Sequence, residues 1–121
     1  MQAFLYVFLG GGLGSMFRYA IAVLMKKNQW DFPIATFTAN AISCIILGAL
    51  IAFALKSQMQ EWSKLLFITG FCGGFSTFST FSNESFQLLQ EGNYSMALLY
   101  IGASLLVCLG CIFLGMKIMG G

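Results

Sequence analysis

The polar residues of this apolar chain are concentrated in one run that mixes glycine, hydroxyl side chains and phenylalanine. The run covers residues 73–82 and reads Gly-Gly-Phe-Ser-Thr-Phe-Ser-Thr-Phe-Ser. Hydroxyl groups donate hydrogen bonds, and the edges of phenylalanine rings are electropositive, so these groups together could stabilise a small anion without a full positive charge. Phe78 and Phe81 would share one helix face. The alternative is that both rings serve only in packing.

Further polar side chains lie within the apolar stretches on either side of this run. Asn40 is either a hydrogen-bonding link between helices or a ligand in a pore. Glu84 is the only carboxylate clearly inside an apolar segment, and with no histidine to accompany it a proton relay is poorly supported. Tyr100, Ser104 and Cys108 follow at intervals of four and so share a helix face. Such a face suits a helix interface or a water-lined path.

The groups that most enzymes and metal sites use are missing. The chain contains no histidine, and no nucleophile, base and orienting residue form a catalytic set, so we expect no enzyme activity. Arg18 is a charge within an apolar stretch, and it either faces protein or a cavity or extends to the membrane surface. Packing accounts better than redox or metal chemistry for the cysteines, which all lie in apolar stretches: Cys44, Cys72, Cys108 and Cys111.

The composition predicts an all-α integral membrane protein. Hydrophobic residues make up 59% of the 121 residues and charged residues only 8%, whereas soluble domains contain about 25% charged residues. The net charge is +2 and no basic cluster exceeds Lys26-Lys27, which predicts no nucleic-acid partner. A bilayer span needs about 20 apolar residues. Four segments of this length are separated by short polar connections, at about 3–25, 33–55, 65–89 and 94–116.

These segments must position the polar run. Connections this short predict that the helices are antiparallel neighbours. Residues 65–72 read as an ordinary apolar helix, and Gly73-Gly74 then allows backbone dihedrals that a helix forbids. We therefore expect the third helix to be broken at 73–76, where freed carbonyl oxygens could coordinate a cation. Glycines in the other segments, such as Gly10 and Gly14, predict close helix packing.

Lysine and arginine give the chain no preferred orientation in a membrane. Topology follows an excess of these residues on cytoplasmic loops. One side carries both termini with Lys56, Lys64 and Lys117, and the other carries Lys26-Lys27 with Arg18 nearby. Neither side has a clear excess. If the chain inserts into the membrane in both orientations, two copies can form an antiparallel homodimer.

The polar run and two motifs before it resemble a known family. Residues 70–82, Gly-Phe-Cys-Gly-Gly-Phe-Ser-Thr-Phe-Ser-Thr-Phe-Ser, closely resemble the signature of the Fluc (CrcB) fluoride channel family. Residues 11–19, Gly-Gly-Leu-Gly-Ser-Met-Phe-Arg-Tyr, resemble its first-span motif, and Asn40 stands at its second-span asparagine. The resemblance covers the whole chain in length, span number and motif order. It implies a multi-pass channel of the bacterial cytoplasmic (inner) membrane that passively exports cytoplasmic fluoride.

The resemblance also implies an architecture and roles for single residues. Members of the family are dual-topology antiparallel homodimers, with two fluoride pores near the interface and a structural sodium ion at the dimer centre. By motif position, the backbone carbonyls of Gly73 and Ser76 would hold the sodium, and Arg18 would have a structural role. Cys108 falls at the end of the fourth-span polar track. The implied pore residues come from the last three spans: Asn40, Phe78, Thr80, Phe81, Glu84, Tyr100 and Ser104.

Two other functions fit a chain of four short spans. A small multidrug exporter of dual topology needs a carboxylate in its first span to exchange protons for cations, and residues 3–25 contain none. A non-transporting structural subunit of the membrane would give no ion flux after purification and reconstitution. A measurement of fluoride flux through the purified protein therefore distinguishes a fluoride channel from both alternatives.

Overall fold

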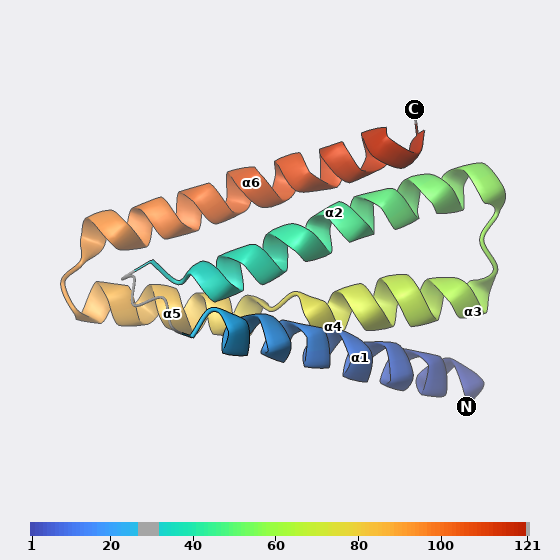
Figure 1. The fold of residues 1–121 in the computed structure, drawn as a ribbon, viewed down its shortest axis with the longest axis horizontal. Coiled ribbons are helices and arrows are strands. Elements are labelled where there is room, and N and C mark those ends of the chain that lie inside the picture. The colour runs from blue at the N-terminus through green and yellow to red at the C-terminus, as the bar shows by residue number, and fades with distance from the viewer. Residues whose placement is uncertain (27–31, 121) are drawn as a thin grey trace.

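The computed structural model describes residues 1–26 and 32–120, so Lys27, which entered the orientation argument, lies outside the described residues. Four long helical spans run back and forth, and both termini lie at the same end of the bundle (Figure 1). Each span is long and apolar enough to cross a membrane, which confirms the predicted class. The spans are α1 (Gln2–Leu24), α2 (Ile34–Ser57), a composite third span (Glu61–Gln90) and α6 (Tyr94–Gly120).

The third span is assembled from several helical pieces. It begins with α3 (Glu61–Ser63) and continues through the π-helix η1 (Lys64–Cys72), α4 (Gly73–Phe75) and α5 (Phe78–Gln90). The prediction of an ordinary helix over 65–72 is therefore wrong. A π-helix forms i to i+5 hydrogen bonds and so fits more residues into each turn than an α-helix does. The apolar residues of η1 show almost no helical periodicity, which is why the sequence did not reveal this geometry.

The closest helix pairs join spans that are next but one in the sequence. Consecutive spans do run in opposite directions (Figure 1), but α1 packs mainly on η1 and α4, and α2 packs mainly on α6. Each of these pairs is parallel. Consecutive spans are thus antiparallel and in contact, as expected, but the closest packing joins spans that are next but one. Contact distance is set here by glycine, which lets two backbones approach one another, and the connections only set direction.

Glycines on both helices allow the close contact between α1 and the third span. A Cβ atom on Gly14 would overlap the carbonyl oxygen of Phe71, and one on Gly74 would overlap the carbonyl oxygen of Gly11. The same arrangement joins α2 to α6, where a Cβ on Gly48 would overlap the carbonyl of Ile112. Glycine does not always mark such a contact, however. A Cβ would find open space at Gly12, Gly102 and Gly110.

The ends of the third and fourth spans differ from the predicted bounds. The third span already begins at Glu61, and α6 continues past Lys117 to Gly120. At the end of α6, the Nζ of Lys56 donates to the carbonyl oxygen of Met119 at 3.4 Å. A cation beside the last carbonyls of a helix satisfies an acceptor that has no partner in the helix and interacts favourably with the helix dipole.

Candidate functional site

The helical backbone is interrupted between α4 and α5. Ser76 has φ −83° and ψ 158°, and Thr77 has φ −149° and ψ 124°, both in the extended region. Gly73 keeps helical dihedrals of −64° and −36°, and Gly92 is the only glycine among the described residues with a positive φ. The predicted reason for an interruption, the backbone freedom of Gly73-Gly74, is therefore wrong. The extended residues come after the glycines, and Gly74 is needed instead for its close contact with α1.

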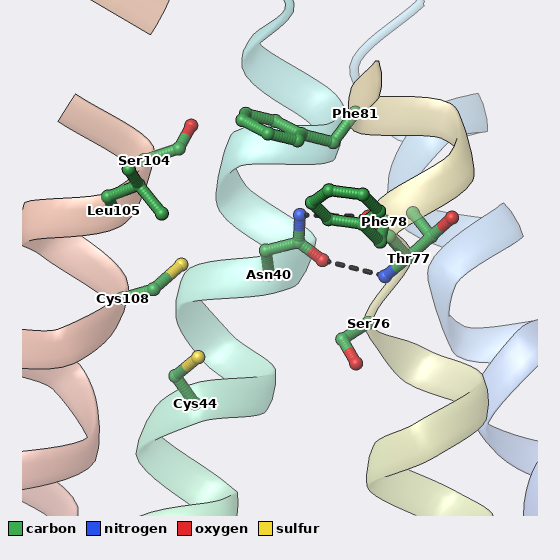
Figure 2. Close-up of a pocket in the computed structure, with 9 residues that line it drawn as sticks. All are labelled: Asn40, Cys44, Ser76, Thr77, Phe78, Phe81, Ser104, Leu105 and Cys108. Carbon is green, nitrogen blue, oxygen red and sulfur yellow. Dashed lines mark hydrogen bonds between the residues drawn. The ribbon is translucent and has the colours of Figure 1, made fainter. Parts of the chain in front are cut away.

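Asn40 on α2 holds the interruption through two hydrogen bonds to one residue. The backbone N–H of Thr77 donates to the Oδ1 of Asn40 at 2.9 Å, and the Nδ2 of Asn40 donates to the carbonyl of Thr77 at 3.3 Å (Figure 2). The Thr77 side chain then begins α5, because its Oγ1 accepts from the N–H of Thr80 at 3.2 Å. Threonine is a favoured residue at this capping position. The N–H and carbonyl of Thr77 and the N–H of Thr80 are thus satisfied by side chains.

The carbonyl oxygens before the interruption accept bonds from other spans. The carbonyl of Cys72 accepts from the N–H and Oγ of Ser76, at 3.0 and 2.9 Å, and from the Oγ of Ser43 at 3.2 Å. The carbonyl of Gly74 accepts from the Nε of Arg18 at 3.1 Å and from the Oγ of Ser15 at 3.5 Å. Of the two alternatives for Arg18, the structure shows contact with protein. Its charge lies at the carboxyl end of α4, where the helix dipole favours a cation.

The carbonyl oxygens of residues 73–76 lose the N–H groups that a continuous helix would give them, and those of Gly73 and Ser76 are among them. The N–H of Thr77, four residues after Gly73, donates to Asn40 instead. The N–H of Thr80, four residues after Ser76, donates to the side chain of Thr77. Backbone oxygens released in this way are the ligands that bind small hard cations at broken helices. The oxygens of Gly73 and Ser76 therefore suit the sodium ion that the sequence resemblance implies.

A cavity of about 210 Å³ lies between the interruption, α2 and α6. Asn40, Phe78, Phe81 and Ser104 were predicted to line a pore, and all four are in its wall (Figure 2). Ser104 is 6% exposed, and its Oγ finds no hydrogen-bond partner among the described residues. A buried polar atom normally has a hydrogen-bond partner. The remaining lining residues are Cys44, Ser76, Thr77, Leu105 and Cys108.

The phenylalanines of this cavity have different surroundings. Phe78 is 77% exposed on the surface of the chain, and its ring centroid lies 5.8 Å from that of Phe81. Phe81 is half-buried and packs on Tyr100, with ring centroids 5.1 Å apart. One ring is therefore anchored by the fold of a single chain, while the other projects from it. A second surface against Phe78 would complete the enclosure of the cavity.

The other predicted pore residues lie outside this cavity. Tyr100 is fully buried behind Phe81 and donates from its hydroxyl to Oε1 of Glu84 at 2.9 Å. Thr80 accepts from the Oγ1 of Thr77 at 3.1 Å and lines a second cavity, of about 260 Å³, together with Arg18. The structure thus brings four of the predicted pore residues into one wall and places Tyr100, Glu84 and Thr80 beside it.

Sequence reasoning missed two residues that shape the site. Thr77 fixes both ends of the interruption and contributes to both cavities. The only local signal for this role was its residue type, since threonine is favoured at the residue that caps the start of a helix. Ser43 donates to the carbonyl of Cys72 from a completely buried position. A serine inside an apolar segment carries no local signal for such a contact.

Comparison with known proteins identifies the family. A profile of the family described as "CrcB-like protein, Camphor Resistance (CrcB)" matches residues 5–116. The chain belongs to this family. The resemblance seen in the sequence is thereby confirmed, and it extends over most of the four spans.

Relatives of this CrcB-like chain come from distant microorganisms. It is 42% identical to the "Fluoride-specific ion channel FluC" of Azobacteroides pseudotrichonymphae, over 88% of the chain and 87% of the relative. The protein of the same name from Pyrococcus abyssi is 42% identical over 95% of the chain and 94% of the relative. The protein of the same name from Escherichia coli K12 is 44% identical over 88% of the chain and 84% of the relative. All three are named as ion channels, which confirms the expectation of a family without enzyme activity.

Proposed function

We propose that this chain is a fluoride-selective ion channel that passively exports cytoplasmic fluoride. The observation that carries the proposal is the unpaired hydroxyl of Ser104 in a cavity whose wall also contains Phe78 and Phe81. A buried hydroxyl without a partner costs roughly 1–3 kcal/mol. A bound anion would accept its hydrogen bond and remove that cost. The names of the relatives point to fluoride as the anion.

The chemistry of the cavity wall fits passage of the ion rather than permanent binding. Fluoride is small and strongly hydrated, so a pore must replace its water with close donors. Ser104 offers a hydroxyl, and the phenylalanine rings offer weakly positive edges. Lysine and arginine are absent from the lining residues of this cavity. Several weak donors without a full positive charge allow the ion to enter and also to leave.

The proposed assembly is a dual-topology antiparallel homodimer with two pores, in the inner membrane of a bacterium. It is supported by the exposure of Phe78, which leaves the cavity open at the surface of one chain. It is also supported by the balance of lysine and arginine between the two sides of the sequence. A second copy of the chain against Phe78 would close each pore.

The proposed dimer has a structural sodium ion at its centre. The backbone oxygens of Gly73 and Ser76 would hold it, two from each subunit, because both have lost their helical N–H partners. Gly73 is exposed, so its oxygen can face a partner subunit. The ion would supply positive charge that binds the interrupted spans of the two subunits together.

Fluoride efflux from liposomes tests the channel. The purified protein should dissipate a fluoride gradient and leave a chloride gradient intact. Phe78→Ile removes one ring edge from the cavity wall and should stop fluoride efflux, while size-exclusion chromatography still shows a dimer. Phe86→Ile is the matched control, because Phe86 is exposed on the same helix and does not line the cavity. Normal efflux after Phe78→Ile would overturn the pore assignment, and no efflux from the unaltered protein would favour a structural subunit.

A further inference from the structure

Two cysteines from different helices lie side by side in the wall of the pore cavity. Cys44 on α2 and Cys108 on α6 both line this cavity, and Figure 2 shows their side chains on the facing sides of the two helices. Cys44 is one helical turn from Asn40, and Cys108 is one turn from Ser104. Both thiols therefore line the cavity that contains the unpaired Ser104 hydroxyl.

Close packing on one side of the pair fixes its spacing. Gly48 lies one turn beyond Cys44 on α2, and there the backbone of α2 contacts the carbonyl of Ile112, one turn beyond Cys108 on α6. Gly115 makes a similar contact with the carbonyl of Ile45. Neither helix can move away from the other without breaking these backbone contacts. These contacts therefore fix the spacing of the two backbones that carry the thiols.

We propose that Cys44 and Cys108 form a two-coordinate binding site for a thiophilic divalent cation such as Hg²⁺. Thiolates are soft ligands that select soft metals. Zinc prefers four ligands, and the part of the chain that the structure describes holds no group of three or more His, Cys, Asp or Glu side chains able to bind a metal. Two thiols without further ligands suit a cation that accepts linear coordination.

The charge of the product favours a divalent ion. Each thiol loses one proton and forms one sulfur–metal bond, so two thiols and Hg²⁺ give a neutral bis-thiolate and two protons, without electron transfer. A monovalent ion would leave a net negative complex in the cavity wall. Burial of an uncompensated charge is costly, and the cavity wall offers no basic side chain to offset it. The neutral complex avoids that cost.

Intact mass spectrometry of the purified dimer after exposure to Hg²⁺ tests the site. The matched pair of variants is Cys72→Ser/Cys111→Ser, which keeps Cys44 and Cys108, and Cys44→Ser/Cys72→Ser, which keeps the C-x-x-C pair on α6. The first should gain one mercury in place of two hydrogens, with a bridge between the peptides that contain Cys44 and Cys108. In the second variant, mercury should bind to one thiol only, with the loss of one hydrogen and without a bridge between two cysteines. A Cys108–Cys111 bridge, or no bridge in the first variant, would overturn the proposal.

Fluoride efflux adds a functional readout, which rests on the proposed function. A metal between α2 and α6 fills part of the cavity, so Hg²⁺ should abolish most of the efflux through the variant that keeps Cys44 and Cys108. Efflux through the variant that keeps Cys108 and Cys111 should fall much less. Loss of fluoride transport would be seen before Hg²⁺ is added, so failure of the proposed function is distinguishable from failure of the metal site. Bridging without inhibition would overturn the placement of the pair beside the ion path.

Discussion

The amide side chain of Asn40 exchanges two hydrogen bonds with the backbone of Thr77, one in each direction. The Oδ1 accepts from the Thr77 N–H at 2.9 Å, and the Nδ2 donates to the Thr77 carbonyl at 3.3 Å. A backbone amide pairs with its neighbours in the same way inside a sheet. Asn40 thus takes the place of a neighbouring strand for Thr77, one of the two extended residues between α4 and α5.

This pairing makes Asn40 a structural residue as well as part of the cavity wall. Asn40→Ala should leave both Thr77 backbone groups without their partner and destabilise the protein by roughly 1–3 kcal/mol, because half-buried polar groups lose hydrogen bonds. Thermal unfolding in detergent measures the effect. Asn83→Ala is the control, since Asn83 is exposed on α5. Equal unfolding temperatures for the two variants would show that Asn40 does not hold the interruption.

The hydroxyl of Thr77 should be needed to begin α5. Thr77→Val keeps the shape of the side chain but removes the acceptor for the Thr80 N–H, and loss of such a cap costs about 1 kcal/mol. Thr77→Ser keeps the acceptor and should cost much less. The unfolding temperatures of the two variants, compared with the unaltered protein, give the answer. A valine variant as stable as the serine variant would contradict the role of the hydroxyl.

The contact between α1 and the third span should depend on which glycine is changed. In Gly14→Ala the new methyl group would overlap the carbonyl oxygen of Phe71, a backbone atom that cannot rotate away. We expect this variant to lose its folded form in detergent. Gly12→Ala places the same group in open space and should fold normally. Size-exclusion chromatography and circular dichroism compare them, and a stable Gly14→Ala protein would show that the helices are less closely packed.

The buried hydroxyl of Tyr100 should stabilise the protein through Glu84. Tyr100→Phe removes the 2.9 Å hydrogen bond to the half-buried side chain of Glu84, and an intramolecular hydrogen bond contributes about 0.5–1.5 kcal/mol. Tyr94→Phe on the same helix, where the ring is 62% exposed, should have little effect. Glu84→Gln retains an oxygen acceptor and should be milder than Tyr100→Phe. Thermal unfolding of the three variants distinguishes this hydrogen bond from simple packing of the ring.

The proposed sodium site predicts a dependence on the cation but not on the side chain of Ser76. Replacing sodium by N-methylglucamine should lower fluoride efflux, because the backbone oxygens at the dimer centre would lose their ion. Ser76→Thr keeps the backbone oxygen and the hydroxyl that donates to Cys72, so its efflux should show the same sodium dependence. Efflux that is unchanged without sodium, in both proteins, would argue against a structural ion.

The sequence was sufficient for the number of spans and for four residues of the cavity wall. A bilayer requires about 20 apolar residues for each helix and penalises polar ones, so spans and polar exceptions are visible in composition. Asn40 and Ser104 are such polar exceptions, whereas the pore roles expected for them and for Phe78 and Phe81 came from the family resemblance; the structure brings all four into one wall. The sequence could not show which helices pack closely together, because every span contains glycine and only some of these glycines make close contacts.

The position and cause of the interruption also lay beyond local sequence reasoning. Glycine suggested backbone freedom at 73 and 74, yet Gly73 is helical and the extended residues are Ser76 and Thr77. The N–H of Thr77 is drawn from its helical acceptor by Asn40, a residue 37 positions away in the chain. A contact at that separation depends on the packing of α2, which no pattern within the third span records.

The pairing of next-but-one spans has a consequence for the order in which the chain can assemble during synthesis. The glycine contact of α1 is with η1 and α4, and that of α2 is with α6. The first two spans therefore enter the membrane before the close partner of either has been made. The α1 contact can form once the third span has been inserted, and the α2 contact only after the last. The cavity between α2, α5 and α6 can consequently take shape only after α6 has been inserted.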